Sequence, residues 1–184
     1  MSADTVKANA MLAGLGRTRR VILGDNLLEQ FTPDEIEVIF AHEIGHHVHG
    51  HIRKMILLGG LYSLAGFWVC DRLLTAWISW QGQAVDYAHF PIHTLPLLLL
   101  IVTLLATLTE PLQNLVSRYF ERQCDQYALD RTKLPAAYVS AFEKLAKLNK
   151  DDPDPHPVEV FFLHSHPPIR QRLALAEEGA RGRD

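Results

Sequence analysis

Apolar residues are concentrated in two long stretches near the middle of the chain. Residues 55–70, MILLGGLYSLAGFWVC, carry no charge and continue past the pair Asp71 and Arg72 into LLTAWISW. Residues 92–109, IHTLPLLLLIVTLLATLT, form a second uncharged run of membrane-spanning length. Together they predict a two-helix transmembrane hairpin over residues 55–109. The alternative is a pair of buried core helices, because the first run is short unless it tolerates the charged pair.

The placement of lysine and arginine orients the predicted hairpin. The connection between the two runs, QGQAVDYAHFP at residues 81–91, contains neither residue type. Basic residues flank the outer ends of the hairpin instead: Arg53, Lys54, Arg118 and Arg122. Positive charge favours the cytoplasmic side, so we expect a multi-pass membrane protein whose flanking segments face the cytoplasm.

A polar helix is predicted just before the hairpin. Thr32 offers an N-cap, Pro33 suits the first helical position, and Glu35 completes a capping box. The following residues continue without a helix breaker except Gly45, where a small residue would let another element approach.

This helix carries FAHEIGHHVHGH, residues 40–51. Residues four apart share one helix face, so His42 and His46 can hold one metal ion while Glu43 reaches a water beside it. The spacing is that of the H-E-x-x-H zinc pattern. A solvated histidine-rich face is the alternative, and it explains the other histidines of this stretch better than it explains this pair.

A zinc hydrolase needs three protein ligands and one open position for water. His51 does not fit the metzincin spacing, because that pattern wants Gly and His where His49 and Ile52 stand. We therefore expect His51 to support a ligand or to lie at the surface. The best third ligand is Glu121, with Asp125 four residues later able to fix a ligand imidazole.

Four segments occur in the order seen in a known family: NAMLAGLGRTRRVILGDNLL, HEIGHHVHGH, ERQCDQYAL and HSHPPIRQRL. The chain resembles the M48 zinc metallopeptidases, the Ste24 and HtpX-like group, over most of its length. The resemblance implies a zincin-like (gluzincin) core in which two membrane helices separate the zinc-binding helices. It also implies Glu121 as third ligand and Asp125 as its supporting aspartate. Cys124 departs from the alanine that the family commonly has before that aspartate.

The resemblance also implies roles for residues outside the zinc helices. His166 and Arg172 match a histidine and an arginine that lie near the metal and stabilise the transition state or position substrate. A strand containing Asn9 and Ala10 matches one that binds an extended peptide along its edge.

Local patterns predict the remaining elements. Residues 6–13 and 19–23 are expected to form two strands, and a hairpin that only covers the core is an equally open alternative to substrate binding. Residues 134–150 show helical spacing and predict a packing helix, whereas residues 151–159 predict a proline-rich loop.

Composition narrows the class of protein. A chain of 184 residues can form one domain with its own core, with residues 55–109 inserted between the zinc helices. The net charge of −3 gives no basic field for nucleic acid, and two cysteines do not make a disulfide framework. No cleavable signal peptide is expected at the start of the chain.

These observations predict a mainly α-helical, membrane-embedded zinc endopeptidase with a small β-hairpin. It would hold one Zn²⁺ per chain, contact membrane lipid and act on peptide or protein substrates. The alternative is a catalytically silent, zinc-stabilised membrane module that binds partners through the strand edge. Glu43 argues against that alternative, because a structural site needs ligands and no general base.

Overall fold

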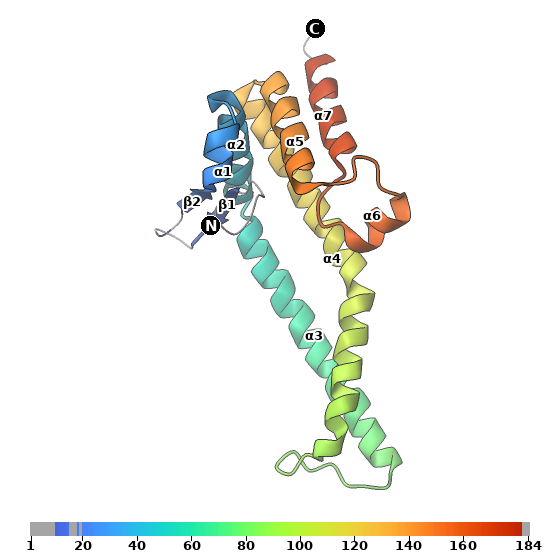
Figure 1. Cartoon of the computed structure of the whole chain (residues 1–184). Coiled ribbons are helices and arrows are strands. Elements are labelled where there is room, and N and C mark those ends of the chain that lie inside the picture. The colour runs from blue at the N-terminus through green and yellow to red at the C-terminus, as the bar shows by residue number, and fades with distance from the viewer. Residues whose placement is uncertain (1–9, 15–17, 19, 182–184) are drawn as a thin grey trace. The chain divides into compact units, whose positions relative to one another are not determined.

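The computed structural model describes residues 10–14, 18 and 20–181, and most of them are helical (Figure 1). The elements follow in the order β1, β2, α1, α2, α3, η2, α4, α5, α6 and α7. The prediction of a mainly α-helical chain is confirmed.

The chain divides into two compact units. Unit 1 comprises residues 1–52 and 113–184, and unit 2 comprises residues 53–112. The predicted hairpin, residues 55–109, falls within unit 2. That the whole chain is one peptidase domain with an insertion stays a prediction.

A small antiparallel hairpin opens unit 1. β1 (Ala10–Ala13) pairs with β2 (Arg20–Leu23), and β1 packs against α2 (Pro33–Val48). The strands predicted over residues 6–13 and 19–23 are longer, and their remaining positions lie outside the described residues.

The helix α2 begins where the sequence predicts. The Thr32 hydroxyl accepts a hydrogen bond from the backbone N–H of Glu35 at 3.4 Å. The Glu35 carboxylate accepts one from the backbone N–H of Thr32 at 2.7 Å, and Pro33 occupies the first turn. The predicted capping box is therefore confirmed.

The same glutamate also joins α2 to α5 (Pro135–Asn149), the helix predicted over residues 134–150. The Lys144 ammonium donates to the Glu35 carboxylate at 2.7 Å, and the Ser140 hydroxyl donates to its other oxygen. Burial raises the pKa of Glu35, but these hydrogen bonds outweigh burial and lower the pKa to about 2.

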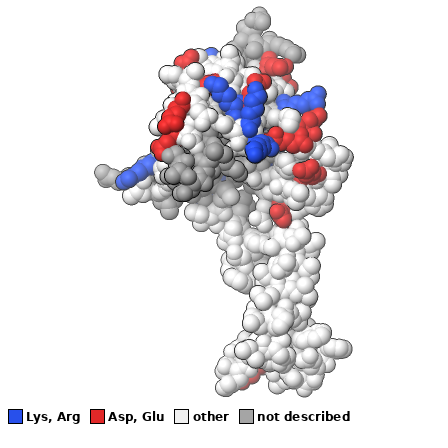
Figure 2. All heavy atoms as spheres, in the orientation of Figure 1, with Lys and Arg blue, Asp and Glu red and all other residues white. Residues whose placement is uncertain are grey.

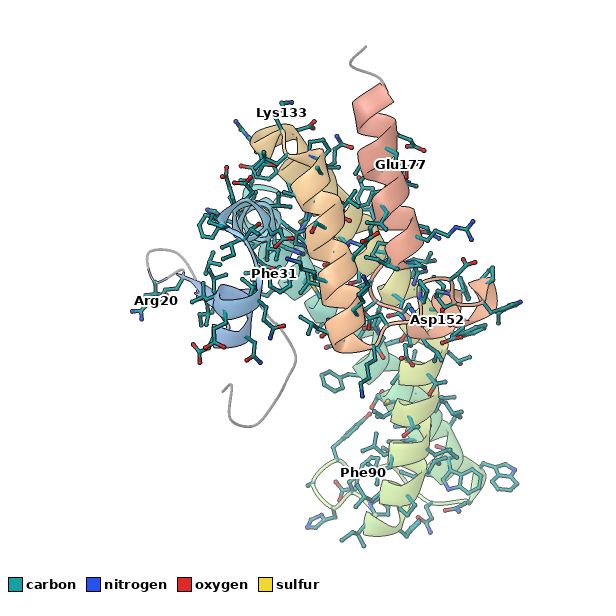
Figure 3. All side chains as sticks on the ribbon, turned by 45° about the horizontal axis from the view of Figure 1, so that its top comes forward. Arg20, Phe31, Phe90, Lys133, Asp152 and Glu177 are labelled. Carbon is teal, nitrogen blue, oxygen red and sulfur yellow. The ribbon has the colours of Figure 1, made fainter. Side chains whose placement is uncertain are left out.

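Two apolar clusters hold unit 1 together. The larger lies among α2, α4 (Leu95–Thr132), α5 and α7 (Ile169–Arg181), and consists of Val38, Ala128, Leu129, Tyr138, Phe142 and Ala176. The smaller joins α1 (Asp25–Gln30) to α2 and α5 through Leu27, Phe31, Ile39 and Ala141. Phe31 is labelled in Figure 3. These clusters hold in place the helices that carry the candidate site.

The loop predicted over residues 151–159 is wrong at its end, because α6 (Pro157–Leu163) already begins there. The carbonyl groups of α6 accept hydrogen bonds from α4. Asn114 donates to the Phe162 carbonyl at 2.7 Å, and Arg118 donates to the Val160 carbonyl at 2.8 Å. The proline-rich composition predicted a loop. Composition reflects only neighbouring residues, so it could not reveal the distant donors that bind α6.

Unit 2 is built from most of α3 (His51–Trp80), the 3₁₀ turn η2 (Ile92–Thr94) and the start of α4. Its core is small and consists of Cys70, Leu74 and Ile101, with a few leucines packed against them. On the face shown in Figure 2, few charged side chains lie on this unit.

Two described helical segments, His51–Trp80 and Ile92–Thr132, are long and apolar enough to cross a membrane. Only 6% and 11% of their apolar windows are buried. A core helix of a soluble protein would be mostly buried, so these values disfavour the alternative of two core helices. Most apolar side chains of these two segments are exposed, and a lipid environment would accommodate them.

Candidate functional site

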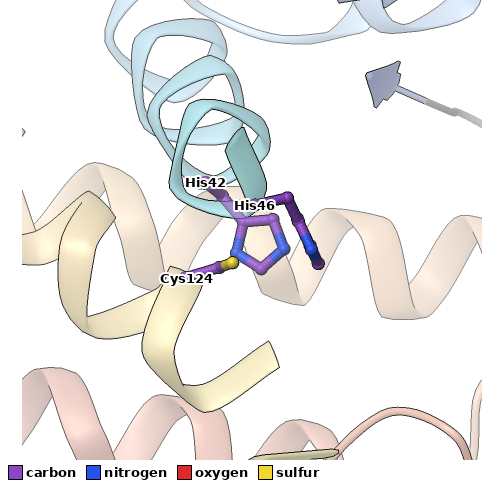
Figure 4. A group of neighbouring side chains, drawn as sticks. All are labelled: His42, His46 and Cys124. Carbon is purple, nitrogen blue, oxygen red and sulfur yellow. The ribbon is translucent and has the colours of Figure 1, made fainter. Parts of the chain in front are cut away.

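The helix α2 places His42 and His46 one turn apart on the same face. Their ring centroids lie 5.2 Å apart in an edge-to-face arrangement. His42 is buried and His46 is half-buried. Figure 4 shows both rings projecting from α2 toward α4.

The helix α4 brings two carboxylates to these rings. Glu121 Oε2 lies 3.3 Å from His42 Nε2, and Glu121 Oε1 lies 3.3 Å from His46 Nε2. Asp125 Oδ1 lies 2.9 Å from His42 Nδ1, on the opposite side of that ring. The structure therefore brings together His42, His46 and Glu121, the three predicted ligands, and places Asp125 beside the ring of His42.

The carboxylates change the protonation of His42. Burial lowers the pKa of His42, but its hydrogen bonds to Asp125 and Glu121 outweigh burial and raise the pKa to about 9. A positive charge is thus stabilised between these side chains. A bound metal ion would replace that proton, because a metal-ligating histidine is neutral.

The two helices touch at Gly45. A Cβ at this position would lie 3.0 Å from the Cα of Cys124. The prediction that Gly45 lets another element approach is therefore confirmed. The close approach also brings Cys124 beside His42 and His46, and donor atoms of these three residues lie within 4.8 Å of one another (Figure 4). Cys124 is thus a second candidate for the third ligand.

His51 lies against the rear of the site. The chain turns at Gly50, whose φ is 67°, and His51 then starts α3 with its side chain buried. Its Nδ1 lies 3.2 Å from His46 Nδ1 and its Nε2 lies 3.0 Å from Gln123 Oε1. Its ring stacks on Phe120 with centroids 4.2 Å apart. No local pattern pointed to Gln123, because 72 residues separate it from His51.

Arg172 comes from α7 and binds the aspartate. Its Nε donates to Asp125 Oδ2 at 2.9 Å, and its Nη2 donates to the other carboxylate oxygen. The same Nη2 lies 3.9 Å from Glu121 Oε2, and the guanidinium lies 3.9 Å above the Phe142 ring. Burial lowers the pKa of Arg172, but Asp125 outweighs burial and raises it, so the guanidinium stays charged.

His166 approaches the site from the loop before α7. Its Nε2 lies 3.8 Å from Glu121 Oε1, and its Nδ1 lies 3.0 Å from the Ser165 hydroxyl oxygen. Its side chain is 66% exposed. This exposure distinguishes His166 from Arg172, whose side chain is only 11% exposed, and leaves His166 accessible to a substrate.

Of the remaining predicted site residues, Glu43 lies on α2 and Ala10 lies on β1. Glu43 is half-buried and directly follows His42 on α2. Ala10 is half-buried in β1, which packs against the same helix. Asn9 lies outside the described residues.

The donor set suits a divalent cation. Two carboxylates, Glu121 and Asp125, face the one guanidinium of Arg172, so these three side chains and the neutral histidines carry a net negative charge. Imidazole nitrogens and carboxylate oxygens are ligands that zinc accepts. The residues present therefore fit the metal that the sequence predicts.

Comparison with known proteins identifies relatives of this chain. The model of peptidase family M48 matches residues 1–180. The chain is 37% identical over 182 residues to "Uncharacterized metalloprotease YhfN" of Bacillus subtilis, covering 97% of this chain and 42% of the relative. It is 29% identical to "CAAX prenyl protease 1 homolog" of Arabidopsis thaliana, covering 94% and 40%, and 25% identical to "Protease HtpX homolog" of Bacteroides fragilis, covering 95% and 61%.

A solved structure shares the fold. The crystal structure of S. mikatae Ste24p matches with a TM-score of 0.75 and 24% identity, covering 92% of this chain and 42% of that chain. The chain thus spans about two fifths of the length of this structure and of the first two relatives above.

Proposed function

The chain belongs to peptidase family M48, and we propose that it is a zinc-dependent endopeptidase embedded in a membrane. One observation supports this most strongly: the Nε2 atoms of His42 and His46 both face the Glu121 carboxylate at 3.3 Å, with Asp125 behind one ring. An aspartate behind a ligand histidine is the usual support of a zinc site.

We assign the three ligands as His42, His46 and Glu121, with one zinc per chain. Glu121 is preferred to Cys124 because each of its two oxygens already faces one of the imidazole nitrogens. Cys124 instead fills the contact between α2 and α4, where its backbone meets Gly45. Three protein ligands leave a position open for water, as a catalytic zinc site requires.

Zinc bound here would lower the pKa of a water molecule and polarise the scissile carbonyl. Glu43 is assigned as general base: its carboxylate would take a proton from the attacking water and deliver it to the leaving amine. His166 is assigned to the oxyanion, since its exposed ring can donate a hydrogen bond to substrate. Two N–H groups of Arg172 donate to Asp125. We therefore assign Arg172 to orienting that aspartate, in place of the transition-state role implied by the resemblance.

An extended peptide is the proposed substrate. In the described part of the chain β1 pairs with β2 alone, so its other edge can accept a peptide strand next to the helix that carries the ligands. Main-chain hydrogen bonds would then hold the substrate along the segment containing Asn9 and Ala10. The proposal covers peptides and proteins as a class.

The membrane assignment is also a proposal. Residues 55–80 and 92–109 are proposed to cross the bilayer, with residues 81–91 on the far side. The basic residues beyond both ends of this hairpin support a zinc site on the cytoplasmic side.

A silent zinc module is the competing function, and metal analysis combined with a peptidase assay separates the two. We expect the full chain, purified in detergent, to hold one zinc and to cleave unstructured protein. A chelator should abolish cleavage, and added zinc should restore it. Zinc bound without cleavage of a broad set of peptides would favour the silent module.

Loss of the metal identifies the third ligand. Glu121→Gln should lower zinc content strongly, whereas Cys124→Ala should leave one zinc per chain. The reverse result would make Cys124 the ligand.

A further inference from the structure

His51 is the most buried histidine of the chain, at 1% exposure, although it belongs to neither the ligands nor the general base. It lies between His46, at 3.2 Å, and Gln123, at 3.0 Å, and stacks at 11° on Phe120. A buried imidazole with a partner at each nitrogen has a defined tautomer. Its neighbours decide which one.

The amide oxygen of Gln123 faces His51 Nε2 and can only accept a hydrogen bond, so the proton of a neutral His51 lies on Nε2. His51 Nδ1 is then an acceptor, and the nearby His46 Nδ1 must donate to it. His46 Nε2 therefore keeps its lone pair. That lone pair faces Glu121 Oε1 at 3.3 Å, and two acceptors at this distance repel each other unless a cation lies between them.

We propose that His51 and Gln123 are positioning residues that hold His46 in the tautomer whose Nε2 binds the metal. The inference rests on the proposed zinc site. Gln123 Oε1 accepts from His51 Nε2, and His51 Nδ1 accepts from His46 Nδ1. Cys124 fits this arrangement, because its thiol lies 3.6 Å from the same His51 Nδ1 and can also donate to it.

The two ligand histidines thus have different supports. His42 donates to the carboxylate of Asp125, whereas His46 donates to the neutral imidazole of His51, which in turn donates to the amide oxygen of Gln123. A second carboxylate behind His46 would add negative charge to a cluster that already holds Glu121 and Asp125. The neutral chain orients His46 without that cost. Its loss should weaken zinc binding about 10- to 100-fold, as removal of such a support does elsewhere.

Substitutions that keep the ring stack test the proposal. In the full chain in detergent, His51→Phe retains an aromatic ring on Phe120 and loses both hydrogen bonds. We expect the zinc dissociation constant, measured by competition with a chelator, to rise about 10- to 100-fold. His49→Phe is the matched control, because it removes a neighbouring histidine that stacks on His51 and should leave the constant unchanged.

Gln123 offers a pair of variants at a half-buried position, which keeps the test valid if His51→Phe fails to fold. Gln123→Leu removes the acceptor and should weaken zinc binding, whereas Gln123→Glu keeps an acceptor and should bind zinc more tightly than Gln123→Leu. A residue that only fills space would not separate these two variants. Equal zinc affinity of Gln123→Leu, Gln123→Glu and the parent would overturn the inference.

The tautomer itself can be observed. Long-range ¹H–¹⁵N correlation spectra of the zinc-loaded chain should show the His51 proton on Nε2 and the His46 proton on Nδ1. A proton on His51 Nδ1 would overturn the inference while the zinc site stands. A parent chain that binds no zinc would overturn the proposed function and this inference with it.

Discussion

The two halves of α4 bury different kinds of side chain. In its first half, Ile101 is buried while Leu99, Leu104 and Leu108 are about half exposed or more. In its second half, Glu121 and Asp125 are buried, with exposed fractions of 7% and 1%. Exposing leucines to water costs free energy, and so does removing carboxylates from water without a partner. This difference is what we expect if the first half meets lipid and the second half builds a metal site, as proposed above.

Removing the general base should give the largest effect on the metal-site half of this comparison. Glu43→Gln is expected to lower turnover about 10²- to 10⁴-fold while one zinc per chain remains, because the proposed mechanism gives Glu43 the proton transfer and gives other residues the binding of the ion. Peptidase rates and metal content of the same preparation measure both. Glu37→Gln, an exposed position of α2, is the control. Loss of zinc in Glu43→Gln would make Glu43 a ligand.

A charged side chain introduced into the apolar part of α3 tests whether lipid or water surrounds this segment. Leu64 of α3 is 69% exposed. If this segment crosses a bilayer, Leu64→Asp should disfavour insertion by about 3 kcal/mol, whereas an exposed substitution in water should change stability by less than about 0.5 kcal/mol. The fraction of chain that resists alkaline extraction from membranes measures the difference, with Leu64→Ala as control. Unchanged extraction would assign this region to water.

Substitution of His166, the exposed histidine of the site, should give the next largest effect. His166→Ala should lower kcat about 10²-fold, which is typical of one lost oxyanion donor, and zinc content should not change. His164→Ala, two residues away, should leave kcat near the parent value. Unchanged kcat in His166→Ala would make His166 structural, and lost zinc would make it a ligand.

The smallest effect is expected for the acid stability of unit 1, which depends on the contact between Glu35 and Lys144. The folded-state pKa of Glu35 is lowered to about 2 from an ordinary 4.5, so its contribution is complete above pH 4.5 and is lost as the pH falls toward 2. Glu35→Gln keeps a capping side chain but loses the charge facing Lys144, which should cost about 1–3 kcal/mol at neutral pH. Denaturant unfolding at several pH values measures this.

The cost of Glu35→Gln should shrink below pH 4.5, because the parent loses the same interaction there. Asp34→Asn, at an exposed position of the same turn, is the control. A cost that is independent of pH would show that hydrogen-bond geometry, and not charge, stabilises this turn.

Local patterns predicted the elements whose causes are local. The capping box at Thr32 and Glu35 follows from neighbouring residues, and so does the helical spacing of His42 and His46. Gly45 was predicted to admit another element, although its partner Cys124 could not be identified from spacing. These predictions succeeded because helix geometry alone places residues four apart on one face.

Contacts between distant segments explain what the sequence left open. His51 was expected to support a ligand or lie at the surface, and only its contact with Gln123 in α4 gives it a defined geometry. Residues 157–159 were predicted as loop because the donors that hold α6, Asn114 and Arg118, lie more than forty residues away. No short pattern encodes such pairs.

The turn at Gly50 has a consequence for anyone who transplants this site onto another scaffold. On an unbroken helix, His51 would point about 140° around the axis from His46, since five residues advance about 500°. The left-handed backbone of Gly50, with φ at 67°, ends one helix and starts the next, so His51 meets His46 at 3.2 Å. A graft of HEIGH alone would copy two ligands without the second histidine's support. The portable unit is the twelve-residue segment through His51, together with an acceptor on the facing helix.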